Sequence, residues 1–182
     1  PHKVLTDTLW AGERSTNPDM ALRAILHRFR LMIDAEGLDE MKDCIVTSRG
    51  YYQWNPHLDC SVDVFEVNDL SELARKESDA EKRSRIYEQI VNLYDGRLLP
   101  QSASEPWVES VSVRLHGQYR TAILNLLELC KKWGESTRIV TLCTRALELD
   151  PYEERLYLEK IVALETLGRH EEAQDLARRG SA

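Results

Sequence analysis

The clearest hydrophobic pattern near the start of the chain lies within residues 17–33. Apolar side chains recur there every three or four residues, which places them on one face of a helix. They are Leu22, Ile25, Leu26, Phe29 and Ile33. Asn17 and Pro18 predict where this helix begins, because Asn caps a first turn well and Pro suits the first helical position. We expect the apolar stripe to face a core. A shorter helix over Leu5 to Trp10, ending near Gly12, should precede it.

The following stretch has a pattern that is typical of strands. Residues 44–47 and 51–54 are rich in β-branched and aromatic side chains, and Ser48-Arg49-Gly50 between them has the composition of a tight turn. The sequence therefore predicts a β-hairpin with Arg49 at its tip.

The rest of the chain has helical periodicity. We expect helices over residues 63–76, 79–94, 107–133, 136–149, 153–167 and 170–179. Gly117 lies inside the longest of them and lowers its stability by about 1 kcal/mol relative to alanine. Gly134 ends that helix.

Two of the glycines also mark an internal repeat. Gly134 and Gly168 are 34 residues apart, which is the period of tetratricopeptide repeats. Ala146 and Pro151 then fall on the small second-helix position and the last marked position of one repeat. The matching packing positions are Ile123, Leu126 and Cys130 in the first repeat and Tyr157, Leu164 and Ala173 in the second.

Two positions depart from this repeat pattern. Ile139 stands where a small residue is usual, and Lys160 stands where an apolar residue is usual. The helix pair at residues 63–94 is a candidate for a third, degenerate repeat. About three repeats are needed for a stable stack, so this addition is physically reasonable.

The composition is that of an ordinary globular protein, with 182 residues, 42% apolar and 30% charged. The net charge of −7 argues against a uniformly basic nucleic-acid coat, but it is compatible with a local basic element. No run of about 18 apolar residues and no signal peptide is visible, so we expect no membrane segment.

The four cysteines are Cys44, Cys60, Cys130 and Cys143. None forms a CxxC pair, so zinc and redox motifs are unsupported. We expect reduced, mostly buried thiols in a cytoplasmic protein, with no metal and no cofactor.

No motif nominates an active site. Phosphate-loop, GxGxxG, GxSxG and HExxH patterns are absent from the sequence. The many carboxylates lie on expected helices whose solvent-facing sides need charge. We therefore interpret the chain as a non-enzyme.

The helix over residues 17–33 is locally basic, with three Arg and one Asp. Arg23 and Arg30 flank one side of its apolar stripe, and Arg28 flanks the other. A short helix, an Arg-bearing helix and a hairpin with Arg49 at its tip, in that order, are the layout of a winged helix. There the second helix enters the major groove and the hairpin touches backbone or minor groove. An amphipathic helix with three Arg is also common without DNA function, so this pattern alone leaves both interpretations open.

At the level of whole segments, residues 4–56 resemble the later part of an OmpR-type winged-helix DNA-binding domain. The matching residues are Leu9-Trp10, Asn17-Pro18, Ala21-Leu22-Arg23, His27-Arg28-Phe29-Arg30 and the segment from Ile45 to Tyr52. Residues 62–179 resemble the bacterial transcriptional activator domain. The matching segments there are Val62 to Glu66, Tyr94 to Pro100, Pro106 to Val108, Leu147 to Pro151 and Gly168 to Ala173. Together they look like the SARP/AfsR-like transcriptional regulators.

This resemblance implies a mainly α fold. A partial winged helix at residues 1–58, made of helices plus a hairpin wing, would precede tetratricopeptide-like helical hairpins at 59–182. It implies a bacterial cytoplasmic regulator that binds promoter DNA, often as a homodimer, and whose helical domain contacts a second protomer or RNA polymerase. The residues implied at the DNA are Arg23, Ala24, His27 and Arg30 on the recognition helix, Arg28 nearer the backbone, and Arg49 in the wing.

One departure from the family changes the expectation for these residues on their own. An OmpR-type domain opens with a small β-sheet and a first helix ahead of the matched segment, and this sequence does not contain them. We expect apolar side chains to be exposed as a result, or to pack on the helical domain or on a second chain. These are Leu5, Leu9, Trp10, Leu22, Ile25 and Phe29. We also expect weak or no DNA binding by the 182 residues alone, and binding by the complete parent protein.

A second function hypothesis stays open beside the regulator. Stacked helix pairs form concave surfaces that bind proteins or peptides. The chain would then be a tetratricopeptide-like interaction scaffold without DNA binding.

Overall fold

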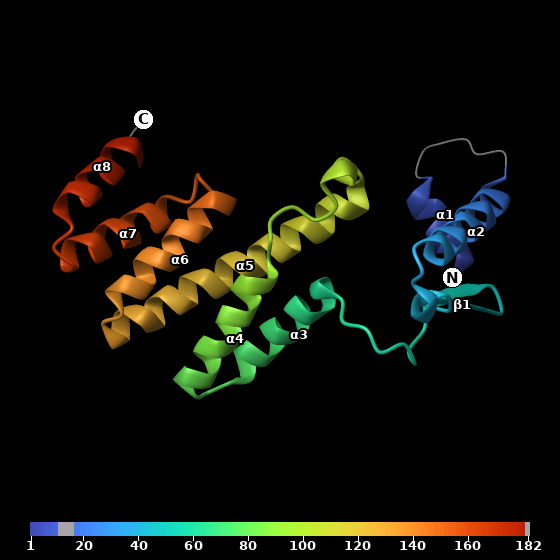
Figure 1. The fold of residues 1–182 in the computed structure, drawn as a ribbon, viewed down its shortest axis with the longest axis horizontal. Coiled ribbons are helices and arrows are strands. Elements are labelled where there is room, and N and C mark those ends of the chain that lie inside the picture. The colour runs from blue at the N-terminus through green and yellow to red at the C-terminus, as the bar shows by residue number, and fades with distance from the viewer. Residues whose placement is uncertain (11–16, 181–182) are drawn as a thin grey trace. The chain divides into compact units, whose positions relative to one another are not determined.

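The structure, a computed structural model, describes residues 1–10 and 17–180. The chain forms two compact units, Pro1–Cys60 and Ser61–Ala182. Within the described part, the first unit contains the only β-sheet, a two-stranded hairpin, and the second is built from helices (Figure 1). The mainly α fold with a β-hairpin that the sequence predicts is therefore confirmed.

The first unit has two helices before its hairpin. Its elements are α1 (His2–Leu9), α2 (Pro18–Ala35), a short 3-10 helix η1 (Asp39–Met41), β1 (Ile45–Ser48) and β2 (Tyr51–Trp54). The expected start of α1 at Leu5 is wrong, because the amides of Val4 and Leu5 already donate to the carbonyl of Pro1. The apolar residues used for the prediction begin at Leu5, about one turn after the helix itself begins at His2, so they give no sign of the first turn. Trp10, expected to be helical, instead follows α1, and the expected end near Gly12 lies outside the described residues.

The hairpin has the register that its turn requires. Ser48 pairs with Tyr51, and φ is +44° at Arg49 and +81° at Gly50. Two central residues with positive φ are typical of the type I′ turn, whose twist matches that of the strands. The expected hairpin, with Arg49 at its tip, is confirmed.

The core of the first unit is small. Within its described residues, the fully buried apolar side chains are Leu22, Ile33 and Cys44. The expectation that the whole stripe of α2 faces a core is wrong, because Ile25 is 44% exposed. The expected exposure of Leu22 is wrong as well, since it is one of the three side chains that this small unit does bury. The exposure expected for Leu9 and Ile25 is confirmed.

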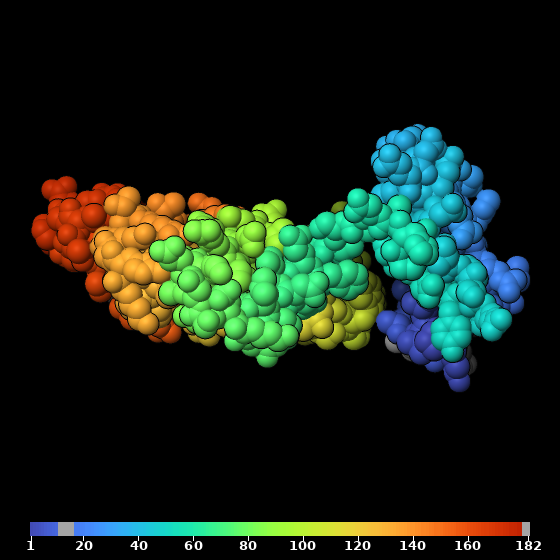
Figure 2. Space-filling model, turned by 90° about the horizontal axis from the view of Figure 1, so that it is seen from below, coloured from blue at the N-terminus to red at the C-terminus, as the bar shows by residue number. Residues whose placement is uncertain are grey.

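The second unit consists of successive helical pairs. Its elements are α3 (Asp63–Lys76), α4 (Ala80–Leu93), a short 3-10 helix η2 (Pro100–Ser102), α5 (Pro106–Trp133), α6 (Ser136–Leu149), α7 (Glu154–Thr166) and α8 (His170–Gly180). Each helix packs on the next along the chain, and α3 also packs on α5. In Figure 2 the red α8 lies at one end of this unit, the orange segments lie beside it, and the green α3 and α4 lie beyond them. These bounds agree closely with the helices that the sequence predicts.

The two repeat glycines have the same local structure. Beyond α5, Gly134 has a φ of +72° and the amide of Glu135 donates to the carbonyl of Cys130 over 2.9 Å. Beyond α7, Gly168 has a φ of +74° and the amide of Arg169 donates to Leu164 over 2.9 Å. Both are Schellman motifs, which need a left-handed residue that glycine supplies without strain. The 34-residue repeat thus ends its first helix in the same way twice.

The core of the second unit runs through all of its helices. The repeat positions Ile123, Leu126, Cys130, Ala146, Leu164 and Ala173 are all buried in one cluster. Ile139 is buried as well, although a small residue is usual there, while Lys160 is only half-buried. The pair α3 and α4 joins the same cluster, but its connection has no glycine. Instead the side chain of Asp79 caps α4 by accepting from the amide of Lys82 over 2.9 Å.

The long helix α5 packs on α3 and α4 and also on α6, so it connects the first helical pair with the helices that follow. Its 28 residues span about 42 Å at 1.5 Å per residue. Gly117 lies within it without ending it. None of the helices formed by residues 1–10 and 17–180 is both long and apolar enough to cross a membrane.

Candidate functional site

The helix α2 presents the residues that the resemblance implies at DNA. Its start is fixed by Asn17, whose side chain accepts from the amide of Met20 over 3.1 Å. The side chains on its solvent side are Arg23, Ala24, His27, Arg28 and Arg30, and all five are exposed. The structure therefore brings them together on one surface of one helix, opposite buried Leu22 and Ile33.

This surface of α2 is not purely polar. Met20 is 67% exposed and Leu31 is 52% exposed beside the arginines. Aliphatic side chains contact thymine methyl groups but donate no hydrogen bonds to base edges. The arginines and His27 would therefore carry any hydrogen bonding from α2 to bases.

Arg30 differs from the other arginines of α2, because it reaches the hairpin. Its Nη2 donates to the carbonyl of Ile45 in β1 over 3.4 Å, the long end of the hydrogen-bond range. Arg30 thus connects the helix with the first strand. Sequence reasoning gave it only a DNA-facing role, since no local pattern predicts a contact across 15 residues.

The tip of the hairpin is held from the N-terminus of α1. The amide of His2 donates to the carbonyl of Gly50 over 2.9 Å. The ring of His2 lies 5.4 Å from that of Tyr52, and its Nδ1 lies 3.2 Å from a carboxylate oxygen of Asp19 at the start of α2. His2 therefore joins all three parts of the first unit and leaves the neighbouring side chain of Arg49 exposed.

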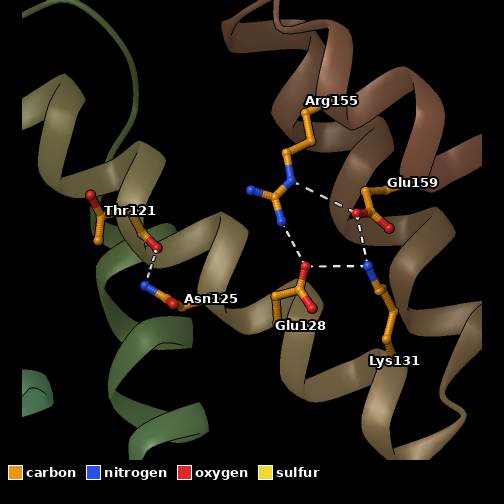
Figure 3. A network of polar contacts seen from close by, with 6 residues as sticks. All are labelled: Thr121, Asn125, Glu128, Lys131, Arg155 and Glu159. Atoms are coloured by element: carbon orange, nitrogen blue, oxygen red, sulfur yellow. Dashed lines mark hydrogen bonds and ion pairs between the residues drawn. The ribbon is translucent and has the colours of Figure 1, made fainter.

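In the second unit, a network of four charged side chains connects α5 with α7 (Figure 3). Lys131 donates to Glu128 over 3.2 Å and to Glu159 over 3.0 Å. Arg155 donates to Glu128 over 2.6 Å. The hydrogen bond from Lys131, followed by the one from Arg155, lowers the pKa of Glu128. The network fixes the spacing of two helices that are not neighbours in sequence.

A second ion pair joins the same two segments further along. The guanidinium of Arg120 in α5 donates to both oxygens of Glu153, the residue just before α7. This contact lowers the pKa of the Glu153 carboxyl and raises that of Arg120.

An aromatic cluster lies where α4, α5 and α6 meet. Tyr119 is buried and stacks on Tyr94 with ring centroids 4.5 Å apart. His116 lies between the hydroxyl of Tyr94, 3.4 Å away, and a carboxylate oxygen of Asp150, also 3.4 Å away. Burial raises the pKa of Tyr119 to about 12. The cluster anchors the linker after α4 to the middle of the long helix.

The cysteines behave as packing residues. Burial raises the pKa of Cys130 to about 11 and that of Cys143 to about 12, so neither thiol forms a thiolate near neutral pH. Cys44 is also buried, whereas Cys60 is exposed and accepts a hydrogen bond from Trp54 over 3.2 Å. Among residues 1–10 and 17–180, no three His, Cys, Asp or Glu side chains are grouped so that they could hold a metal ion.

Comparison with protein families decides the nature of the second unit. The family model of the bacterial transcriptional activator domain matches residues 62–179. The chain belongs to this family. The match covers α3 to α8, so the helical pairs described above are an activator domain, a regulatory module of transcriptional activators. A search of curated proteins found no match.

The ion pairs between α5 and α7 have only a partial signal in the sequence. The pairs Glu128–Lys131 and Arg155–Glu159 have helical spacings that predict ion pairs within one helix. Their cross-connection depends on how α5 and α7 approach each other, and no signal in the sequence gives that approach.

Proposed function

We propose that the chain is part of a regulator that reads promoter DNA in the bacterial cytoplasm and acts as a homodimer. In this proposal α2 and the hairpin contact DNA, and the activator domain contacts a second protomer or RNA polymerase. The observation that carries it is the family match over residues 62–179, following a unit that exposes arginines on one helix and at one hairpin tip.

Each basic residue would have its own role in this complex. Arg23, His27 and Arg30 would lie on or beside the face of α2 in the major groove, with Ala24 allowing the helix to come close to the bases. Arg28 would contact the phosphate backbone, and Arg49 would reach the backbone or the minor groove from the hairpin. Arg is suited to both tasks, because its guanidinium binds phosphate and guanine in two-bond geometry.

The test is selection of bound sequences from random duplex DNA by the intact gene product at two salt concentrations. We expect enrichment of a short repeated motif and about a 10³-fold loss of affinity between 50 and 200 mM salt if six or more phosphates are contacted. Arg23→Ala should weaken binding by about 1–3 kcal/mol and relax the preference at one base pair. Absence of enrichment with a folded protein would refute the proposal.

The second hypothesis, an interaction scaffold without DNA binding, is favoured by one observation on the activator domain. A pocket of about 390 Å³ lies between the end of α5 and α7, and the side chains of Leu158 and Val162 at its edge are both more than 60% exposed. Apolar peptide binding there would depend far less on salt than DNA binding does. The salt series on the intact gene product therefore separates the two hypotheses.

A further inference from the structure

A separate pocket of about 290 Å³ opens between α3, α4 and α5, entirely within the activator domain. Its apolar lining includes the buried core residues Ala74, Ile90 and Ala122, together with the half-buried Tyr87. Its volume is near the lower end of the range for small-molecule sites, about 300–1,000 Å³.

Gly117 of α5 lines the pocket, although its backbone conformation does not require glycine. Its φ is not positive, and a methyl group at this position would meet no heavy atom within 4 Å. Glycine in a helix interior is less stable than alanine. The absent side chain instead leaves space in the pocket, which a larger residue would take up.

The side chain of Gln118 lines the same pocket and ties α5 to α3. Its Nε2 donates to Asn68 of α3 over 3.0 Å, while its Oε1 is buried and has no partner among the described residues. Buried polar atoms without partners are uncommon in native proteins. This oxygen is closed off from solvent, so it marks the packing of α5 on α3 and is not a contact for a ligand. The hydroxyl of Thr121 is already satisfied, because it donates to the carbonyl of Gly117 over 2.8 Å.

The rim of the pocket is positively charged. Arg75 pairs with Glu72, so this pair contributes little net charge. Arg114 also lines the pocket, and its side chain forms no hydrogen bond or ion pair with any residue that the structure describes. A free guanidinium beside an apolar floor complements a carboxylate attached to an apolar body.

We propose that this pocket binds a small carboxylate that has an apolar body. The apolar body lies against the half-buried Tyr87 and the neighbouring lining residues of α3 and α5. The carboxylate binds the guanidinium of Arg114. The proposal concerns the activator domain alone, so it stands or falls independently of DNA binding by the first unit.

The test uses the full 182-residue chain and four probes, titrated by ¹H–¹⁵N NMR. N-acetyl-leucine and 4-hydroxyphenylacetate each combine an apolar body with a carboxylate, and their primary amides are the matched neutral controls. We expect saturable shifts of the amide resonances of Gly117 and Gln118 with at least one acid, and at least tenfold weaker binding of its amide. If neither acid binds saturably, or if amides bind as well as acids, the proposal is wrong.

Three variants locate the binding. Arg114→Gln should weaken the acid at least tenfold, whereas Arg85→Gln, which changes an exposed arginine of α4 outside the pocket lining, should have no effect. Gly117→Leu should abolish saturable binding while the chain stays helical by circular dichroism. Unchanged binding by Arg114→Gln contradicts the proposal even if Gly117→Leu fails to fold.

Discussion

The two units of the chain differ in how they bury their apolar side chains. In the activator domain one core cluster extends from Val67 in α3 to Ala173 in α8. In residues 1–60 the fully buried apolar side chains within the described residues are Leu22, Ile33 and Cys44, while Ile25 and Met32 are exposed. The helical pairs build a core by repetition, because each pair covers the apolar face of the one before it.

The first unit lacks this means of covering its apolar faces. Two helices and a two-stranded hairpin have too little surface to bury one another, and units of about 60 residues are marginal even with a full set of elements. Its positions are therefore held mainly by single polar contacts, such as the hydrogen bond from His2 to Gly50. The difference predicts opposite responses to the same kinds of substitution in the two units.

The largest expected contrast comes from truncating one apolar residue in each unit. Leu126→Ala should lower the free energy of unfolding of the activator domain by about 2–5 kcal/mol, because Leu126 is completely buried. Ile25→Ala should change stability by less than about 1 kcal/mol, because its side chain is largely in water already. Urea denaturation followed by circular dichroism measures both. Equal losses would show that Ile25 is covered in solution.

Glycine replacements sharpen the comparison within the activator domain itself. Gly134→Ala should destabilise it by about 1–2 kcal/mol, because alanine is strained at a φ of +72°. Gly117→Ala should stabilise it by up to about 1 kcal/mol, since that position is helical and open. Thermal unfolding of the two variants gives shifts of opposite sign. Shifts of the same sign would contradict the assignment of Gly134 to a Schellman turn.

In the first unit, a substitution at the hairpin tip should raise the stability of the hairpin while lowering its affinity for DNA. Arg49→Asn should stabilise the hairpin by about 1 kcal/mol, because Asn-Gly is the preferred pair for this turn. The same change should weaken DNA binding by the intact gene product and reduce its salt slope by about 1, because one phosphate contact is lost. Hydrogen exchange at the amides of β1 and β2 reports the first effect, and binding at several salt concentrations reports the second. Unchanged affinity would remove Arg49 from the interface.

The smallest expected effect concerns the ion pair between α5 and α7. Since Arg120 lowers the folded-state pKa of Glu153, ionised Glu153 adds stability that is present above about pH 4.5 and is lost as pH falls through its lower folded value. Glu153→Gln should therefore be less stable than wild type at pH 7, by at most about 1 kcal/mol, and the difference should shrink as the pH falls below about 4.5. Glu148→Gln on the exposed side of α6 is the control, and urea midpoints at about pH 7 and about pH 3 measure the difference. A gap that does not shrink at the lower pH would assign the effect to packing.

Most of the secondary structure could be predicted from the sequence, because its signals are local. Asn17-Pro18 starts α2, and Gly134 and Gly168 end α5 and α7 where the repeat requires a left-handed residue. The start of α1 was missed, since its first turn lacks an apolar pattern. The DNA-binding roles of the arginines on α2 and of Arg49 come from resemblance and stay predictions.

The candidate sites also contain some features that follow from local spacing in the sequence and others that depend on tertiary packing. That Arg23 and His27 share one side of a helix follows from their spacing, and the structure places both on the solvent side of α2. The pocket at Gly117 could not be predicted, because it exists only where α3 and α5 lie beside each other over α4. The bond from Arg30 to Ile45 is of the same kind, since it joins a helix to a strand.

By itself, the sequence determined the order of elements, the 34-residue repeat and the family of the second unit. These depend on periodicity, helix-ending residues and motif order, which act over a few residues or one repeat. Only the tertiary structure decided which apolar faces are covered, which charges meet between α5 and α7, and that a pocket stays open at Gly117. Those features depend on how separate helices approach one another, and that approach is set by the packing of the whole unit.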